Sequence, residues 1–379
     1  MIIGVNGRLL YQDTLEGIHR YVYETTVHMA RMHPETSFIV YLDRKSKATL
    51  PFPSNIKFRT ISLPTRHPLL WLIWFELLLP FYLNQDKVDV FYSADGFLSL
   101  LTRKPQVLVT HDLAFCHYPE HIPLFHLLYY RLFIKKFHEK AKDIIAVSHA
   151  TKDDIITRFG INRKKITVAY NAINHEVTRS KDFISEDIID LVDDNSPYFF
   201  NIGAIHPRKN IKRICEAFSL CKKKYSLPHK LIVAGRFAWK SSQIKKEMKS
   251  TSGVIFIGNI NDSEKSYLYQ HATALLYLSV FEGFGIPILE AMQASCPVVT
   301  SSTSSMPEVA GNAAILANPL DIQSMSDAIY QITDPIQREI FINQGIQRVE
   351  VFSWEDTAEI IYSKLAAQAI FNNKQKVKY

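Results

Sequence analysis

Leu276-Tyr277-Leu278-Ser279-Val280-Phe281-Glu282-Gly283-Phe284-Gly285-Ile286-Pro287-Ile288-Leu289-Glu290-Ala291-Met292 is the stretch around which this chain is organised. Its apolar start predicts a buried strand, its glycines a turn, and its second half a helix with Pro287 at the first position, where a missing N–H is tolerated. The glycines let backbone approach a ligand, and N–H groups at a helix start attract an anion. Glu282 and Glu290 flank the turn, and carboxylates suit the hydroxyls of a sugar or ribose. A phosphate-bearing sugar compound would use both features.

The composition is that of a folded protein with two domains. The chain has 379 residues, with 47% hydrophobic and 21% charged side chains, and this length exceeds one ordinary core. The formal net charge of +7 favours an anionic partner, such as a nucleotide, a phospholipid surface or nucleic acid. The four cysteines form no C-x-x-C pair, so neither a zinc site nor a disulfide framework is indicated.

Two segments bear on the location of the protein. The N-terminus has no basic region before its first apolar run, which predicts a first strand, no signal peptide and a cytoplasmic location. Residues 68–83 are strongly apolar with Glu76 as their only charge, but they are fewer than the ~20 residues that a membrane span needs. We expect a core helix there, with a helix that lies in the membrane interface as the alternative.

Short apolar runs alternate with helical patterns along nearly the whole chain. Strands interleaved with helices of this length need crossover connections, which predict parallel sheets covered on both faces. In the first half we expect strands at 1–6, 37–44, 57–63, 88–92, 107–110 and 143–147, with helices at 17–32, 68–83 and 122–140. In the second half we expect strands at 198–202, 231–233, 254–257, 274–279, 297–300 and 314–317, with helices at 210–224, 241–250, 262–272, 287–294, from Pro307, and at 321–333, 335–350 and 354–370.

This alternation predicts an α/β protein with two Rossmann-like domains that face each other across a cleft. We expect an N-terminal domain at 1–175, an acidic linker or short helix at 176–197, a C-terminal domain at 198–352 and a final helix at 353–371, with no order beyond it. Ligands of such sheets bind outside the carboxyl ends of the strands. The turn at Glu282 lies at such an end.

Three other strand ends or helix starts carry candidate site residues. Arg208 and Lys209 follow the first strand of the second domain, where cations oppose the helix dipole. A bound diphosphate would resolve that conflict, and a solvated basic turn is the alternative. His111 and Asp112 end a strand of the first domain, and an ordinary histidine titrates near neutral pH, which suits sugar binding or proton transfer; packing or capping is the alternative. Gly17 precedes the first helix and could bring backbone N–H groups to a phosphate, or simply start that helix.

Several chemistries lack their motifs. The chain has no G-x-G-x-x-G and no G-x-x-x-x-G-K-[ST], so it lacks the phosphate-binding loops of dinucleotide oxidoreductases and of P-loop NTPases. It has no D-x-D and no G-x-S-x-G, which argues against a metal site of that kind and against the usual serine hydrolases. We expect no metal and no other cofactor. Nucleic-acid binding is disfavoured, because the basic residues are not interleaved with aromatic side chains.

Glu282-x7-Glu290 with the intervening Gly-Phe-Gly-x-Pro resembles the E-x7-E signature of the family four retaining glycosyltransferases, which have the two-domain GT-B fold. The resemblance covers almost the whole chain and is densest from 198 to 330. The other segments similar to that family are Pro207-Arg208-Lys209-Asn210, Pro297-Val298-Val299-Thr300, Met306-Pro307-Glu308-Val309-Ala310-Gly311, Phe352-Ser353-Trp354-Glu355, Ser93-Ala94-Asp95-Gly96, Thr110-His111-Asp112 and Val147-Ser148.

The resemblance implies a role for each candidate on the donor side. Glu290 would bind the ribose hydroxyls of a nucleotide-sugar donor, and Glu282 would bind hydroxyls of the donor sugar. Arg208 and Lys209 would neutralise the negative charge of the leaving diphosphate and so make a metal ion unnecessary. The remaining donor-site groups implied are the N–H groups of Phe284, Gly285 and Ile286, the cations of Arg208 and Lys209, and Gly17 from the opposite domain.

The resemblance also implies the acceptor side and the course of the reaction. His111, Asp112 and His19 would lie there; His19 stands where close relatives have a second glycine. Ala204 stands where many family members have an arginine. Members of the family retain the anomeric configuration through front-face attack, and their final helix crosses back to the first domain.

Together these features predict a retaining glycosyltransferase. The donor would be a nucleotide-diphosphate hexose, with mannose as the first candidate, and the acceptor a saccharide or lipid-linked compound in polysaccharide or lipopolysaccharide assembly. A sugar-nucleotide epimerase or hydrolase on the same fold is the alternative, and a scaffold without chemistry is a third. The segment 122–140 also predicts peripheral contact with the anionic inner face of a membrane, or else a solvated basic face, through Arg131, Lys135, Lys136, His138 and Lys140.

Overall fold

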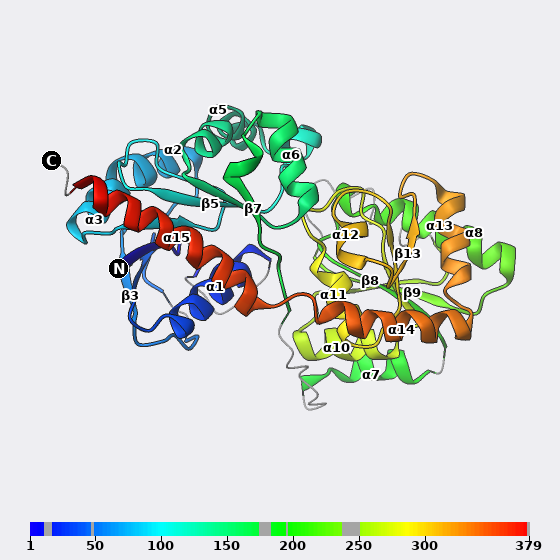
Figure 1. Cartoon of the computed structure of the whole chain (residues 1–379). Coiled ribbons are helices and arrows are strands. Elements are labelled where there is room, and N and C mark those ends of the chain that lie inside the picture. Colours follow the sequence, from blue (N-terminus) through cyan, green and yellow to red (C-terminus); the bar gives the residue numbers. More distant parts are fainter. Residues whose placement is uncertain (11–16, 47–48, 174–182, 195, 237–250, 377–379) are drawn as a thin grey trace. The chain divides into compact units, whose positions relative to one another are not determined.

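The computed structural model describes residues 1–10, 17–46, 49–173, 183–194, 196–236 and 251–376 (Figure 1). The chain divides into two compact units. One comprises Met1–Asn171 with Ser353–Tyr379, and the other comprises Ala172–Phe352. The C-terminal segment thus belongs to the first unit by its contacts, although it follows the second unit in sequence.

The first unit is built on a parallel sheet of seven strands, in the order β3-β2-β1-β4-β5-β6-β7. The strand order reverses between β1 and β4, and such a reversal is the point at which ligands of doubly wound sheets bind. The strands are β1 (Ile2–Asn6), β2 (Ser37–Leu42), β3 (Ile56–Thr60), β4 (Val90–Ser93), β5 (Gln106–Thr110), β6 (Asp143–Ala146) and β7 (Ile166–Val168).

Helices cover this sheet on both faces, as the parallel connections require. Successive residues of β4 show the alternation. Phe91 packs into the aromatic core beneath α2 (Pro68–Leu72) and α5 (Leu124–Lys140), whereas Tyr92 points to α1 (Ile18–Met32), where its hydroxyl lies 3.0 Å from that of Thr25. The helical segments are α1 (Ile18–Met32), α2 (Pro68–Leu72), a π-helical turn (Ile73–Leu78), α3 (Leu79–Gln85), α4 (Ala114–His117), α5 (Leu124–Lys140), α6 (His149–Phe159) and α15 (Trp354–Lys376), with 3-10 turns at Pro119–His121 and Arg163–Lys165.

The apolar segment 68–83 packs into the core, as the sequence predicts, but with one face exposed. Trp74 and Phe75 are fully buried, whereas Leu77 and Phe81 are exposed. The π-helical turn lies directly before Pro80, which has no N–H to donate and crowds the carbonyl one turn earlier, so the helix widens there. In the part of the chain that the structure describes, no helix combines the length and apolarity needed to cross a membrane.

Helix α15 lies along α1 and contacts β4 and β5. Trp354 packs edge-on against Tyr21 with ring centroids 5.7 Å apart, and the Thr357 hydroxyl donates to the carbonyl of Tyr170 at 2.6 Å. The expectation of no order beyond Phe371 is wrong, since the helix continues to Lys376.

The second unit is built on a parallel sheet of six strands, in the order β10-β9-β8-β11-β12-β13, so its reversal lies between β8 and β11. Its strands are β8 (Tyr198–Ile202), β9 (Lys230–Ala234), β10 (Val254–Gly258), β11 (Ala274–Tyr277), β12 (Val298–Ser301) and β13 (Ile315–Ala317). Its helices are α7 (Glu186–Asp193), α8 (Ile211–Tyr225), α10 (Asp262–His271), α11 (Ile286–Gln293), α12 (Met306–Ala310), α13 (Ile322–Gln331) and α14 (Pro335–Val349), with a 3-10 turn at Pro207–Lys209.

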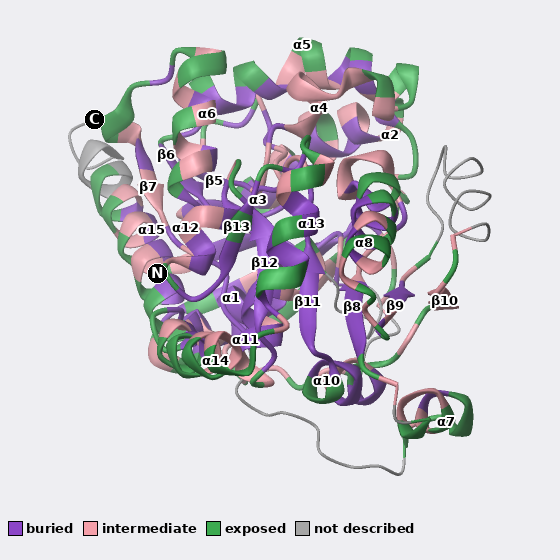
Figure 2. Cartoon of the chain, turned by 90° about the vertical axis from the view of Figure 1, so that its right-hand side faces the viewer, coloured by how far each residue is buried: buried purple, intermediate pink, exposed green. Residues whose placement is uncertain are grey.

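Alternate strand residues again face opposite helical layers in this unit. Phe199 belongs to the core cluster under α8 and α13, whereas Phe200 packs edge-on against Tyr269 of α10 at 5.2 Å. Figure 2 shows the central strands β8, β9, β11 and β12 mostly buried and the outer sides of the surrounding helices exposed, whereas the edge strand β10 has intermediate exposure. Part of the segment expected as a linker forms α7, and the helix expected at 241–250 lies outside the described residues.

Candidate functional site

The stretch quoted at the outset lies at the reversal point of the second sheet. Strand β11 ends at Tyr277, a loop follows, and α11 begins at Ile286. The adjacent strand β8 ends at Ile202 and leads into the turn at Pro207–Lys209. The loops after the two strands that flank the reversal are therefore neighbours, and the N–H of Val280 donates to the carbonyl of Arg208 at 3.0 Å.

Gly285 joins the loop to the helix in a conformation that other residues avoid. Its φ is +109°, and a Cβ there would lie 3.2 Å from the Ile288 side chain, so both backbone and packing favour glycine. The helix begins at Ile286, which places Pro287 at its second position and not its first. In this first turn Pro287 has no N–H and the N–H of Ile288 donates to the carbonyl of Gly285 at 3.0 Å, so the N–H of Ile286 and those of the turn before it are the candidate donors to an anion.

Serine hydroxyls before α12 hold the turn at Glu282–Gly285, here called the glycine turn, in place. The Ser304 hydroxyl lies 2.5 Å from the carbonyl oxygen of Glu282, and the Ser305 hydroxyl lies 2.9 Å from the same atom. Ser305 also lies 2.7 Å from the carbonyl oxygen of Phe284. These contacts fix the backbone of the turn, and they make it a preorganised element.

Glu282 forms a buried ion pair with Lys209. The Lys209 Nζ lies 2.5 Å from Oε1 of Glu282, and the ammonium also donates to the Tyr277 hydroxyl at 2.9 Å. Glu282 is only 7% exposed. Two of the predicted site residues are thus in direct contact, and Tyr277 joins them.

The charges of this cluster set its protonation states. Burial raises the pKa of the Glu282 carboxyl, but the positive charges of Lys209 and Arg208 outweigh burial and bring it below its ordinary value. Burial lowers the pKa of the Lys209 ammonium, and the negative charge of Glu282 reverses that effect and raises it. Burial and Glu282 raise the pKa of the Tyr277 phenol to about 12. At neutral pH the pair is therefore ionised and the phenol is neutral.

Arg208 and Lys209 lie in a 3-10 turn and not in the first turn of α8. Asn210 follows in the left-handed region with φ +62°, and its amide donates to the carbonyl of Leu278 at 3.0 Å. The 3-10 turn is separate from α8 because Pro207 starts it and Asn210, in its left-handed conformation, ends it before the helix begins. Arg208 is half-buried beside the glycine turn.

Glu290 projects from α11 and meets two side chains of α10. Its Oε1 accepts from the Lys265 ammonium at 2.8 Å, and its Oε2 accepts from the Tyr269 hydroxyl at 3.3 Å. Both partners are absent from the sequence-based list of site residues. They are four positions apart on one helix face. This spacing indicates that the two side chains lie on the same face, but not which residue they contact.

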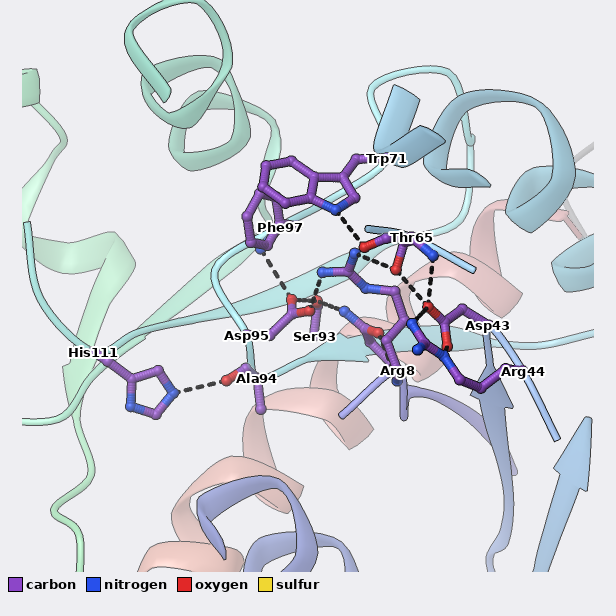
Figure 3. Close-up of polar contacts among 11 residues, drawn as sticks. Arg8, Asp43, Arg44, Thr65, Trp71, Ser93, Ala94, Asp95, Phe97 and His111 are labelled. Atoms are coloured by element: carbon purple, nitrogen blue, oxygen red, sulfur yellow. Dashed lines mark hydrogen bonds and ion pairs between the residues drawn. The ribbon is translucent and has the colours of Figure 1, made fainter. Parts of the chain in front are cut away.

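In the first unit, His111 follows β5 and donates its Nε2 hydrogen to the carbonyl of Ala94 at 2.7 Å (Figure 3). The edge of its ring packs against Tyr21 of α1, with centroids 5.0 Å apart. Burial lowers the pKa of the imidazole, although the Ala94 hydrogen bond and the charges of Asp112 and Asp95 oppose it. The pKa of this imidazole is therefore lower than the ordinary value expected from the sequence, and in the neutral ring that donates from Nε2 the Nδ1 atom carries no hydrogen.

Three residues that the sequence does not single out, Arg8, Thr65 and Asp43, join the loops at the reversal point of the first sheet. Arg8 follows β1 and pairs with Asp95, which follows β4, at 2.5 Å. Arg8 also donates to the Thr65 hydroxyl at 3.2 Å, and that hydroxyl donates to Asp43 at 2.6 Å (Figure 3). The guanidinium carbon of Arg8 lies 4.7 Å from the ring centroid of Phe75.

The other predicted residues of the first unit lie at the same edge of the sheet. Gly17 is the N-cap of α1 with φ +51°, and apart from Gly17 itself and its chain neighbours no atom of the described residues lies within 4 Å of the position of a Cβ there. His19 lies in the first turn of α1. Asp112 follows His111, and its Oδ1 accepts from the N–H of Ala114 at 2.9 Å, which is a local cap. Phosphate or acceptor roles for these residues stay predictions.

Among the described residues, no group of three or more His, Cys, Asp or Glu side chains is placed to hold a metal ion. That the reaction needs no metal ion stays a prediction.

Comparison with known proteins identifies the family. Residues 15–177 match the family described as "Glycosyltransferase Family 4", and residues 184–348 match "Glycosyl transferases group 1". The chain belongs to the family four glycosyltransferases. The predicted family is thereby confirmed, and so is the assignment of the protein as an enzyme of this class, whereas the roles that the E-x7-E motif implies stay predictions.

Two relatives of this glycosyltransferase match most of its length. "O-antigen chain mannosyltransferase B" of Escherichia coli is 28% identical over 364 residues, which cover 90% of the chain and 93% of the relative. "O-antigen chain mannosyltransferase RfbU" of Salmonella typhimurium is 29% identical, over 79% of the chain and 81% of the relative.

Solved structures support the GT-B fold of the glycosyltransferase. WaaG, "a glycosyltransferase involved in lipopolysaccharide biosynthesis", matches with a TM-score of 0.70 at 15% identity, over 96% of the chain and 99% of that structure. Anabaena HepE "in complex with UDP and glucose" matches with a TM-score of 0.68 at 18% identity, over 96% and 99%. The expectation of two Rossmann-like domains in a GT-B fold is confirmed.

Proposed function

We propose that this glycosyltransferase moves a hexose, with mannose as the first candidate, from a nucleotide-diphosphate sugar to a saccharide or lipid-linked acceptor in cell-surface polysaccharide assembly. The observation that carries the proposal is the pair of glutamates at the reversal point of the second sheet, each held by a lysine. The names of the two long relatives support the choice of mannose and of O-antigen chains.

The chemistry of the site suits such a donor. A carboxylate accepts hydrogen bonds from hydroxyls, so Glu282 would bind hydroxyls of the donor sugar and Glu290 would bind those of the ribose. The backbone of the glycine turn and the N–H of Ile286 would donate to phosphate oxygens. Lys209 and Arg208 supply the positive charge that a departing diphosphate needs.

The reaction would retain the anomeric configuration. The acceptor hydroxyl oxygen forms a bond to the anomeric carbon on the face that the diphosphate leaves, and the carbon–oxygen bond to the diphosphate breaks. The departing phosphate oxygen takes the acceptor's proton, so the products are the glycoside and the nucleotide diphosphate. This course needs no protein nucleophile, and we propose that it needs no metal ion.

The donor can be identified by thermal shift against a panel of nucleotide sugars. A ligand present at a hundredfold over its dissociation constant stabilises the folded protein by roughly 2.7 kcal/mol, and one GDP- or UDP-hexose should give the largest shift. A panel in which no nucleotide sugar raises the unfolding midpoint would contradict the proposal.

Acceptor dependence separates the transferase from the alternative enzyme. With the donor selected by the panel, a transferase releases nucleotide diphosphate rapidly only when a saccharide or lipid-linked acceptor is added. A hydrolase releases it from donor alone, and an epimerase changes the sugar without release. Product analysis by NMR shows the anomeric configuration, and inversion would overturn the proposed course.

We also propose that the enzyme is cytoplasmic and contacts an anionic membrane through α5. Four large apolar side chains on the outer face of its first half are more than half exposed: Leu124, Phe125, Leu128 and Leu132. Arg131, Lys135 and Lys136 are exposed on the turns that follow. His138 is buried and bonds to Thr110, so the expectation that it joins this basic face is wrong. Apolar side chains with adjacent cations are typical of interfacial helices.

Co-sedimentation with vesicles that contain anionic lipid tests this contact. Each basic residue near such a surface contributes about 1 kcal/mol, so the double variant Lys135→Glu/Lys136→Glu should lower the partition coefficient at least about tenfold. High salt should weaken binding of the wild-type protein. Lys212→Glu/Lys223→Glu, which reverses the charge of two exposed lysines of α8, is the matched control. No binding of the wild type at low salt would rule the contact out.

A further inference from the structure

We infer that Lys265 is a positioning residue for recognition of the donor's ribose, acting through Glu290. This inference rests on the proposed role of Glu290. Lys265 itself lies on α10 and would touch neither the sugar nor the diphosphate. Its contribution is to hold the Glu290 carboxylate in the orientation that two neighbouring ribose hydroxyls require.

The geometry leaves room for the ribose. Lys265 and Tyr269 each occupy one oxygen of the Glu290 carboxylate, at 2.8 and 3.3 Å. An ionised carboxylate has about four lone-pair positions, so each oxygen keeps one for a hydroxyl. Two donors from one rigid helix, on the two different oxygens, fix the plane of the carboxylate.

Charge and burial make Lys265 the stronger of the two supports. Burial lowers the pKa of its ammonium, and the negative charges of Glu290 and Asp262 reverse that effect and raise it, so the group stays charged. A charge-assisted hydrogen bond is about twice as strong as a neutral one. Asp262 also contacts Lys265 at 2.9 Å but is largely exposed, so that ion pair contributes little.

Binding of a ribonucleotide and of its dideoxy counterpart tests the inference. GDP and 2′,3′-dideoxy-GDP, or the uridine pair where the donor panel selects uridine, would be titrated by calorimetry into the wild type and into Lys265→Met. We expect the variant to bind the ribonucleotide on the order of tenfold more weakly, and to bind the dideoxynucleotide within about twofold of the wild type. The KM for the nucleotide sugar should rise without loss of kcat, because the ribose is remote from the reacting carbon.

Two further variants serve as controls. Lys265→Arg retains the charge and should recover most of the ribonucleotide affinity, and Asp262→Asn removes the exposed partner and should leave both affinities unchanged. Equal weakening of both nucleotides in Lys265→Met, or tighter binding of the ribonucleotide, would overturn the inference. Such tighter binding would mean that the lysine competes with the ribose.

Glu290→Gln separates this inference from the proposed function. If that variant loses ribonucleotide affinity selectively while Lys265→Met does not, Glu290 reads the ribose and only the role of Lys265 is overturned. If Glu290→Gln weakens both nucleotides equally, the proposed role of Glu290 fails, and the role of Lys265 fails with it.

Discussion

Replacing Glu282 with glutamine is expected to lower the turnover of sugar transfer by at least about a hundredfold. The carboxylate is buried and its charge is paired with Lys209, so glutamine keeps the shape and removes the charge that orders both the lysine and the sugar hydroxyls. Affinity for nucleotide diphosphate should not fall, because the variant leaves Lys209 free to meet the diphosphate. Turnover at saturating donor and calorimetric titration of the nucleotide diphosphate measure the two effects.

The matched control is Glu216→Gln on α8. Glu216 also pairs with a lysine, Lys212, but both side chains are exposed and lie 4.0 Å apart, so loss of this pair should change turnover by less than about twofold. If Glu282→Gln retains more than about a third of the wild-type turnover, Glu282 has no central role in transfer. A parallel loss of nucleotide affinity would instead indicate that the turn itself has collapsed.

The glycine turn could be predicted because all of its signals are local. A buried run, two glycines and a proline within Leu276–Met292 are enough to specify strand, turn and helix. The parallel sheets follow from the same kind of local alternation. The alternation does not reveal elements that are very short or very polar. Strand β7, with three residues, and helix α6, whose exposed face is rich in charge, are therefore not among the predicted elements.

The partners of the site residues could not be predicted, because they depend on tertiary packing. Lys209 and Glu282 are both predicted site residues, but 73 positions separate them, and nothing local indicates that one neutralises the other. Lys265 is 25 positions from Glu290 and sits in a helix whose only clear signal is its capping box at Asn261. Arg8 follows a strand without any motif, so its pair with Asp95 emerges only when β1 and β4 are adjacent.

Replacing Asp95 with alanine is expected to lower the free energy of unfolding of the first unit by about 3–5 kcal/mol, the usual result of breaking a buried ion pair. Arg8 is only 6% exposed, and its Nε is already buried without a hydrogen-bond partner among the described residues. The guanidinium would lose its countercharge while remaining enclosed by aromatic rings. Trp74 packs beside Arg8, so tryptophan fluorescence during denaturant unfolding reports on this region.

The double variant Arg8→Met/Asp95→Leu distinguishes an unpaired charge from lost packing. Buried ion pairs replaced by apolar side chains of similar volume often leave stability unchanged or raised, so this variant should recover most of what Asp95→Ala loses. Recovery of stability without recovery of transfer would mean that the pair also sets the loop after β4, whose Ala94 carbonyl fixes the tautomer of His111. If Asp95→Ala unfolds within about 1 kcal/mol of the wild type, the pair is solvated in the folded protein and the loops at this reversal point are held by Thr65 and Asp43 instead.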